Sequence, residues 1–323
     1  MYDMHYDLLT ILYFNLTKQN PLSNIPKLLK NCKKIYQHNV LGGIINLYFM
    51  SHEEMLEELG ITEEELHNVE KMFKKSITYL EQLKKEKIIP YDIEFLYSIE
   101  GCDYLKNEND LEILYNLGLR AILPVWNEKN KFGSGNRSEE GLTELGQRLI
   151  KKAMNLGIIV DVSHANQKTF YNILEVVEEQ MKYNKDAIVM ATHSNVKSIC
   201  HKERNLDDQQ LKRLKELGCY IGLFTNSKFL SDNYQELDYK ERQEVFLKHL
   251  NYIIYQIKFP IDKIIVSTDD MNFHPDPKYH RTEAFKIETI AIDMYELIKK
   301  NLSEEIAEAI LIKNPQTIIK KVK

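Results

Sequence analysis

Residues 141–170 read GLTELGQRLIKKAMNLGIIVDVSHANQKTF, and they contain the clearest evidence for the fold. An amphipathic helical pattern covers 142–156, a β-rich apolar run follows over 157–163, and a second helical pattern begins at 166. This alternation is typical of the helix and strand units of an α/β protein. His164 follows the predicted strand directly, so a chemically versatile side chain stands where that strand ends.

Short apolar runs alternate with longer amphipathic stretches along the rest of the chain. Eight strands joined by helix-sized connections are the number that closes a parallel barrel, and an open doubly wound sheet is the alternative. No internal repeat or Pro- or Ser-rich linker divides the chain. We therefore predict an α/β fold, a single (β/α)8 TIM barrel with extra helices, as one domain over residues 1–323. The predicted strands are 2–6, 43–49, 94–99, 120–126, 157–163, 187–193, 219–224 and 263–268, and the predicted helices are 52–88, 142–156, 166–183, 207–217, 236–258, 281–300 and 303–313.

Composition and charge limit the classes of partner. The chain has 323 residues, and 43 Lys and Arg against 48 Asp and Glu leave a formal net charge of −5 with both signs interspersed. This pattern predicts no nucleic-acid or membrane partner and favours a small molecule. The four cysteines form no CxxC pair, the start MYDMHYDLLT lacks the features of a signal peptide, and no stretch of 18 uncharged apolar residues occurs. We expect a cytoplasmic protein.

Ionisable residues stand at the carboxyl ends of five predicted strands, where barrel active sites are built. Taken singly, each has an ordinary explanation, because a histidine at a strand end is more often hydrogen-bonded than metal-bound and a carboxylate there often caps a turn. Their convergence on one rim favours a shared site. Three histidines with carboxylates suit Zn²⁺ or a similar ion, and a bridging carboxylate suits two ions. The residues are His5 and Asp7, Glu100, His164, His193, and Asp269 with Asp270.

A set of segments in the same order along the chain resembles the membrane (renal) dipeptidases and their bacterial relatives, within the metal-dependent amidohydrolase-like barrels. The stretch from Gly141 to His164 and the pairing of THS with RNLDD are the specific parts of this resemblance. The matching segments are DMHYDL from Asp3, YSIEG from Tyr97, LGLRAILPVWN from Leu117, the 141–170 stretch, ATHSN from Ala191, CHKERNLDD from Cys200 and VSTDD from Val266.

The resemblance implies a zinc dipeptidase with two Zn²⁺ per chain and a water held between them as hydroxide. It implies that Asp269 carries the proton of the attacking water to the leaving amine, and that Arg204 pairs with the free carboxylate of a dipeptide substrate. On the residues alone, Arg204 has the alternative of a surface residue before a helix. Relatives are often dimers, so a homodimer is compatible with the resemblance. The implied metal ligands are His5 and Asp7 on one ion, Glu100 as a catalytic bridge, and His164 and His193 on the other, with Trp126 and Asn127 as further substrate contacts.

Two departures from the family pattern affect the expected activity. Trp126 stands where many relatives have a histidine that polarises the scissile carbonyl, and it has an alternative role as a packing aromatic. The family's Asp-x-Asp-Gly after the last strand reads Asp269-Asp270-Met271-Asn272 here. Two alternatives to a dipeptidase therefore stay open. One is another amidohydrolase that acts on a cyclic amide, a lactone or an N-acyl amino acid, and the other is a non-catalytic binding barrel.

Overall fold

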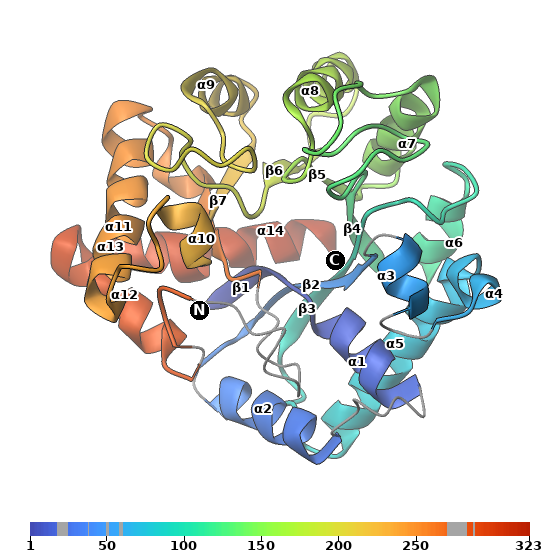
Figure 1. Cartoon of the computed structure of the whole chain (residues 1–323), viewed down its shortest axis with the longest axis horizontal. Coiled ribbons are helices and arrows are strands. Elements are labelled where there is room, and N and C mark those ends of the chain that lie inside the picture. The colour runs from blue at the N-terminus through green and yellow to red at the C-terminus, as the bar shows by residue number, and fades with distance from the viewer. Residues whose placement is uncertain (18–24, 38, 50–51, 58–60, 270–282, 287) are drawn as a thin grey trace.

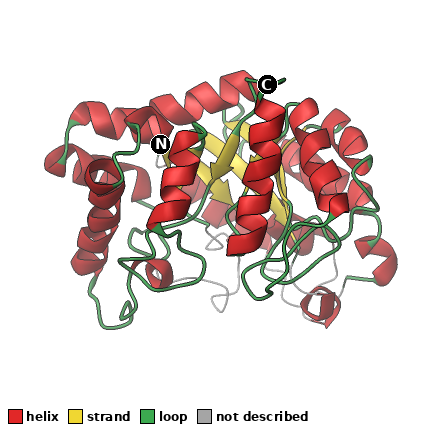
Figure 2. Ribbon diagram, turned by 90° about the horizontal axis from the view of Figure 1, so that it is seen from above, coloured by secondary structure: helices red, strands yellow, loops and turns green. Residues whose placement is uncertain are grey.

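The computed structural model describes residues 1–17, 25–37, 39–49, 52–57, 61–269, 283–286 and 288–323. Within these ranges eight parallel strands form one sheet, and each strand pairs with the next in sequence. The N–H of Asp269, just after the last strand, donates to the carbonyl of His5 in the first strand at 2.8 Å. The sheet is thus a nearly closed barrel ringed by helices, as predicted (Figures 1 and 2). The strands are β1 Tyr2–Tyr6, β2 Gly42–Tyr48, β3 Glu94–Glu100, β4 Leu119–Leu123, β5 Ile159–Asp161, β6 Val189–Ala191, β7 Tyr220–Phe224 and β8 Ile264–Ser267.

Helices cover the outside of the barrel, and α11 and α13 each continue into a π-helical turn, over Tyr252–Gln256 and Ala309–Lys313. None of the helices in the described ranges is long and apolar enough to span a bilayer. The helices are α1 Leu8–Thr17, α2 Ile25–Gln37, α3 His52–Glu57, α4 Glu63–Leu66, α5 Val69–Lys85, α6 Asp110–Asn116, α7 Glu144–Asn155, α8 Gln167–Met181, α9 Asp208–Glu216, α10 Ser227–Leu230, α11 Tyr239–Asn251, α12 Ile290–Asn301, α13 Glu304–Glu308 and α14 Asn314–Val322.

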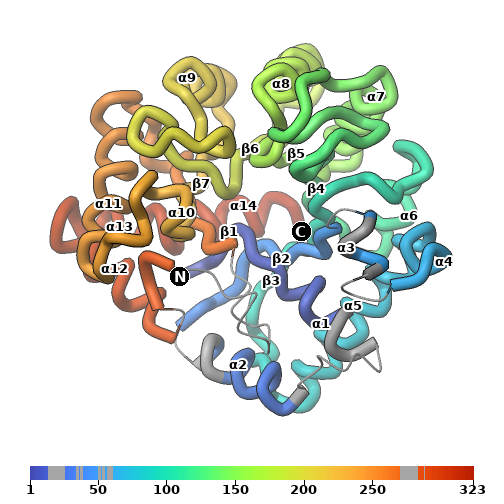
Figure 3. Tube along the Cα trace, in the orientation of Figure 1, coloured from blue at the N-terminus to red at the C-terminus, as the bar shows by residue number. Residues whose placement is uncertain are grey.

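Apolar side chains fill the amino-terminal half of the barrel. Met4, Ile44 and Leu96, from the first three strands, are at most 1% exposed and belong to one cluster with Ile318 and Ile319 of α14. In Figure 3, α14 accordingly runs behind the strands and covers this end of the barrel. Since that end is apolar and covered, the polar residues that follow the strands gather at the opposite, carboxyl end.

The predicted helix over 52–88 is wrong as a single element, because two polar residues start new helices inside it. The side chain of Thr62 accepts from the N–H of Glu65, which caps α4, and that of Asn68 accepts from the N–H of Lys71, which caps α5. Such side chains satisfy the amide groups that have no partner in the first turn of a helix. The dense Glu/Lys pattern therefore spans α3, α4 and α5.

Other boundaries also differ from the predictions. The helix expected over 281–300 begins at Ile290, after an isolated bridge between Glu283 and Asn226. The fifth and sixth strands end at Asp161 and Ala191, so the two histidines predicted at their ends lie in the loops just beyond. Asp270, Met271 and Asn272, where the family motif is altered, lie outside the described residues.

Candidate active site

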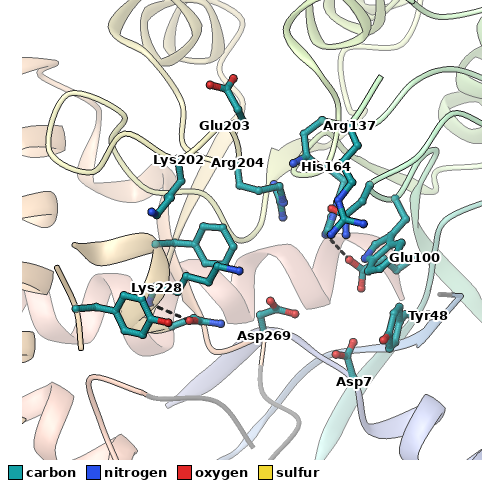
Figure 4. Close-up of a pocket in the computed structure, with 16 residues that line it drawn as sticks. Asp7, Tyr48, Glu100, Arg137, His164, Lys202, Glu203, Arg204, Lys228 and Asp269 are labelled. Carbon is teal, nitrogen blue, oxygen red and sulfur yellow. Dashed lines mark hydrogen bonds and ion pairs between the residues drawn. The ribbon is translucent and has the colours of Figure 1, made fainter. Parts of the chain in front are cut away.

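A cavity of about 600 Å³ opens at the carboxyl ends of the strands. Asp7, Glu100, His164 and Asp269 line one part of it, and cationic side chains from the loops after β6 and β7 line another (Figure 4). The sequence prediction that strand-end residues converge on one rim therefore agrees with the described structure. The lining also includes Trp126, Asn127 and Arg204, each predicted to contact substrate.

Glu100, the last residue of β3, is the centre of the cluster. One of its oxygens, Oε2, lies 3.0 Å from Nε2 of His5. The other, Oε1, lies 2.7 Å from Nε2 of His164 and 3.7 Å from Nε2 of His193. All four side chains are at least 93% buried. Glu100 thus offers a separate oxygen to each side of the cluster, as a bridging ligand requires.

Oxygen atoms behind the cluster determine which nitrogen of each imidazole faces Glu100. The Thr192 hydroxyl has one proton, which it donates to the acceptor-only carboxylate of Asp161. Its lone pairs can then accept from Nδ1 of His5 at 3.1 Å and from Nδ1 of His193 at 2.8 Å. We assign Nδ1 as the protonated nitrogen of both histidines when Nε2 holds a metal ion.

The third imidazole has an equivalent arrangement from a different segment. Asn127 Oδ1 lies 3.0 Å from Nδ1 of His164 and is oriented to accept its proton. Asn127 follows Trp126, whose ring centre lies 6.0 Å from that of His164 and 5.7 Å from that of Tyr48. The loop that carries both residues depends on Gly135, because a Cβ there would lie 1.7 Å from the Trp126 carbonyl oxygen.

Burial and charge together set the protonation of the centre. Burial opposes ionisation of Glu100, but the imidazoles of His5 and His164 hold the pKa of this carboxyl below its usual range. Burial and the charge of Arg204 lower the pKa of His164 to about 3, so its imidazole is neutral at pH 7. Burial favours neutral His5 as well, but Glu100 and the other nearby carboxylates raise its pKa to about 9. In the metal-free protein His5 therefore carries a second proton. This proton offsets carboxylate charge that a bound cation would otherwise balance.

Asp269 reaches the cluster from a backbone conformation that few residues adopt. Its φ is 51°, in the left-handed region, where Asp is better tolerated than most residues. Its Oδ1 lies 3.9 Å from Nε2 of His5, and its side chain is 13% exposed, whereas that of His5 is fully buried. Such conformations cluster at functional sites. Asp269 therefore touches both the buried centre and the open cavity.

Asp3 connects the first strand of the barrel to the segment that follows the last strand. Its carboxylate accepts from the N–H of Thr268 at 2.9 Å, from the Thr268 hydroxyl at 2.5 Å and from the N–H of His5 at 3.3 Å. Burial raises its pKa to about 7, against these hydrogen bonds. Asp3 thus ties β1 to the segment that carries Asp269.

The donor set fits divalent metal ions. Metal bonds of about 2.0–2.2 Å place two ligand atoms of one ion roughly 3–3.5 Å apart, close to the separations between Glu100 and the three histidines. Three groups of side chains have ligand atoms within 4.8 Å of one another. Glu100 belongs to two of these groups. The groups are Glu100, His164 and His193; His5, Asp7, Glu100 and Asp269; and His5, His193 and Asp269.

The sequence profile of the family described as "Membrane dipeptidase (Peptidase family M19)" matches residues 1–323. The chain belongs to this family. Membership confirms the family that the motifs of the chain resemble.

Solved structures of M19 proteins share its fold. A metallopeptidase described as dipeptidase AC is 20% identical, with a TM-score of 0.73 over 99% of this chain and 98% of that one. A Rhodobacter sphaeroides metallopeptidase, liganded with a phosphinate mimic of the dipeptide L-Ala-D-Ala, is 20% identical, with a TM-score of 0.69 over 100% and 99%. Among curated proteins, an uncharacterized protein in the PQQ-III 3′ region of Acinetobacter calcoaceticus is 33% identical over 169 residues, 49% of this chain and 50% of its own length. The chain thus spans about half the length of that relative.

Asp161, Ser163 and Thr192 are not among the site residues predicted from the sequence. Ser163 Oγ donates to Asp161 Oδ1 and accepts from the N–H of His193 at 3.2 Å, so it joins the two loops that carry the histidines. Only their positions in the sequence could have indicated such roles, because Asp161 stands three residues before His164 and Thr192 directly before His193.

Proposed function

We propose that this M19 protein is a zinc dipeptidase with a binuclear centre. The observation that carries the proposal is the buried cluster around Glu100, in which three imidazoles aim Nε2 at one carboxylate while oxygen partners occupy their Nδ1 atoms. A residue suited to bind a free carboxylate lies in the same cavity. The proposed ligands are His5 and Asp7 on one ion, His164 and His193 on the other, and Glu100 on both.

When bound, two such ions activate a water molecule at neutral pH and polarise the carbonyl of the scissile amide. Asp269 accepts the proton of the attacking water and delivers it to the leaving amine, for which its contact with both the cavity and His5 suits it. Thr192 orients His5 and His193, and Asn127 orients His164, through contacts with their Nδ1 atoms. The net reaction adds one water across the peptide bond and releases two amino acids.

Arg204 gives the site its preference for short peptides. It is 7% exposed and lines the cavity, and its charge acts on His164 strongly enough to lower the pKa of that imidazole. A planar, always charged guanidinium suits the α-carboxylate at the end of a dipeptide. Lactones and cyclic amides lack that carboxylate, whereas N-acyl amino acids have it. Trp126 and Asn127 lie on the same side as His164, where Trp126 packs against the substrate.

A hydrolysis panel on the Zn²⁺-loaded protein tests this proposal. The panel contains dipeptides with L and D residues at the carboxyl end, N-acetyl amino acids, a cyclic dipeptide and a lactone. We expect the linear dipeptides to be hydrolysed with the highest kcat/KM. Faster hydrolysis of the lactone, the cyclic dipeptide or the N-acetyl amino acids would contradict the dipeptidase assignment, and turnover of none would favour a binding barrel.

We also propose that residues 1–323 act as a single catalytic domain and that the protein is cytoplasmic. The four cysteines, Cys32, Cys102, Cys200 and Cys219, are all free and buried, which suits a reducing compartment.

A further inference from the structure

Two lysines line the cavity on the side of Arg204 (Figure 4). Lys202 precedes Arg204 in the loop after β6, and Lys228 lies in α10, after β7. Neither belongs to the proposed metal centre. Arg204 alone can pair with the single α-carboxylate of a dipeptide. The wall of the cavity that Arg204 and Lys228 form therefore carries more positive charge than one carboxylate requires.

Buried hydrogen bonds hold Lys228 beside Arg204. The side chain of Asn205, next to Arg204, donates through Nδ2 to the carbonyl of Phe229, next to Lys228, at 2.9 Å. The side chain of Asn195 donates to the same carbonyl at 3.2 Å. Both asparagines are at most 1% exposed. The two cations therefore lie on segments whose relative position is fixed.

The charge of Lys228 is directed at the cavity. Among the residues that the structure describes, Lys202 forms an ion pair with Asp232 at 3.5 Å, whereas Lys228 forms none and its Nζ lies 5.8 Å from the ring centre of Phe229. Lys228 lines the cavity, and its backbone N–H donates to Asn226 Oδ1 at 3.1 Å, which fixes the start of α10.

The carboxylates that line the cavity do not neutralise this wall. Asp7, Glu100 and Asp269 lie in the proposed metal centre, where bound cations balance them. Glu203 is mostly exposed and forms an ion pair with Lys197 at 2.9 Å. The wall formed by Arg204 and Lys228 is therefore positive, and it faces the end of the substrate that carries the α-carboxylate.

We infer that the preferred substrates are dipeptides whose carboxyl-terminal residue is aspartate or glutamate, with Lys228 receiving the side-chain carboxylate while Arg204 holds the α-carboxylate. This inference rests on the proposed dipeptidase function and names its substrate class. A charge-assisted hydrogen bond in a partly enclosed cavity favours the acid over its amide by about tenfold or more in kcat/KM.

The test compares isosteric substrates on the Zn²⁺-loaded protein. Ala-Glu is measured against Ala-Gln, and Ala-Asp against Ala-Asn, with both configurations of the second residue. We expect the acid-to-amide ratio of kcat/KM to be about ten or more, expressed mainly in KM, and to fall as ionic strength rises. Lys228→Met should bring the ratio close to one, and Lys228→Arg should preserve most of it.

Lys182→Met is the matched control, because Lys182 is a cation at the end of α8 outside the cavity lining. It removes the same charge and should leave the ratio at its original value. Equal kcat/KM for acid and amide peptides, or a ratio that survives Lys228→Met, would overturn the inference while leaving the dipeptidase function in place. Hydrolysis of neither peptide would overturn both.

Discussion

Thr192→Val is expected to weaken metal binding without removing any ligand. Valine has nearly the shape of threonine but no hydroxyl, so the substitution deletes the oxygen that lies 3.1 Å from Nδ1 of His5 and 2.8 Å from Nδ1 of His193. It also removes the proton that Thr192 donates to buried Asp161. Both imidazoles lose the acceptor that selects their tautomer, and Nε2 is no longer held toward Glu100.

The size of the effect follows from the two imidazoles that this hydroxyl orients. Removal of one outer hydrogen bond to a ligating histidine costs about 10- to 100-fold in metal affinity, or roughly 1.4–2.8 kcal/mol. Thr192 serves two histidines, so we place the loss at the upper end, about 100-fold. Without its donation to Asp161, the free energy of unfolding of the metal-free protein falls by about 1–3 kcal/mol.

A competition titration of the metal-free protein against a Zn²⁺ chelator measures the affinity, and urea unfolding measures the stability. Thr192→Ser keeps the hydroxyl and is the matched control, for which we expect an affinity within a few-fold of the original. If Thr192→Val bound Zn²⁺ as tightly as the original protein, the hydroxyl would not orient the ligands and the tautomer assignment would be wrong.

Three further predictions address the other parts of the site and the buried core. Arg204→Gln should lower kcat/KM for dipeptides by about 10- to 100-fold, mainly through KM, and should leave dipeptide amides nearly unaffected; equal losses on both substrates would contradict carboxylate recognition. Asp269→Asn should lower kcat by about 10²- to 10⁴-fold, and unchanged turnover in a steady-state assay would refute the proton-transfer role. Burial lowers the pKa of His249 from 6.5 to about 4. The unfolded chain therefore takes up this proton first, and the free energy of unfolding falls by up to about 3 kcal/mol as the pH drops from 6.5 to about 4. His249→Gln should remove that part of the pH dependence in urea titrations at neutral and acidic pH, and an unchanged dependence would contradict it.

The strands and their terminal residues could be predicted from the sequence because both signals are local. A strand buried on both faces is a continuous apolar run, as in β2 and β8, and a barrel places whatever follows each run at one rim. His5 and Glu100 are 95 residues apart, yet each is found beside its own apolar run. Closure of the barrel then brings the two residues together at the same rim.

One helix that the prediction missed, α1, lacks an amphipathic pattern. In α1, Leu8, Leu9, Ile11 and Leu12 are all fully buried, so no polar face marks the helix period. The opposite error occurs over 52–88, where a polar pattern continues through two helix starts that only the capping contacts of Thr62 and Asn68 distinguish.

The residues behind the metal centre could not be predicted from local patterns. Thr192 contacts His5 across 187 residues, and a threonine after a strand has no property that distinguishes this role from packing. The position of Lys228 could not be predicted either, because it depends on the contacts that Asn195 and Asn205 make with the carbonyl of Phe229. Such pairings follow from the closed barrel and the register of its loops, which a single sequence does not specify residue by residue.

Two ions bound in the Glu100 cluster are proposed to support dipeptide hydrolysis. The most direct test titrates Zn²⁺ into the metal-free protein while the hydrolysis of Ala-Glu is recorded. We expect no hydrolysis without metal and a rate that reaches its plateau at two equivalents of Zn²⁺ per chain. Hydrolysis by the metal-free protein, a plateau at one equivalent, or no hydrolysis at saturation would contradict it.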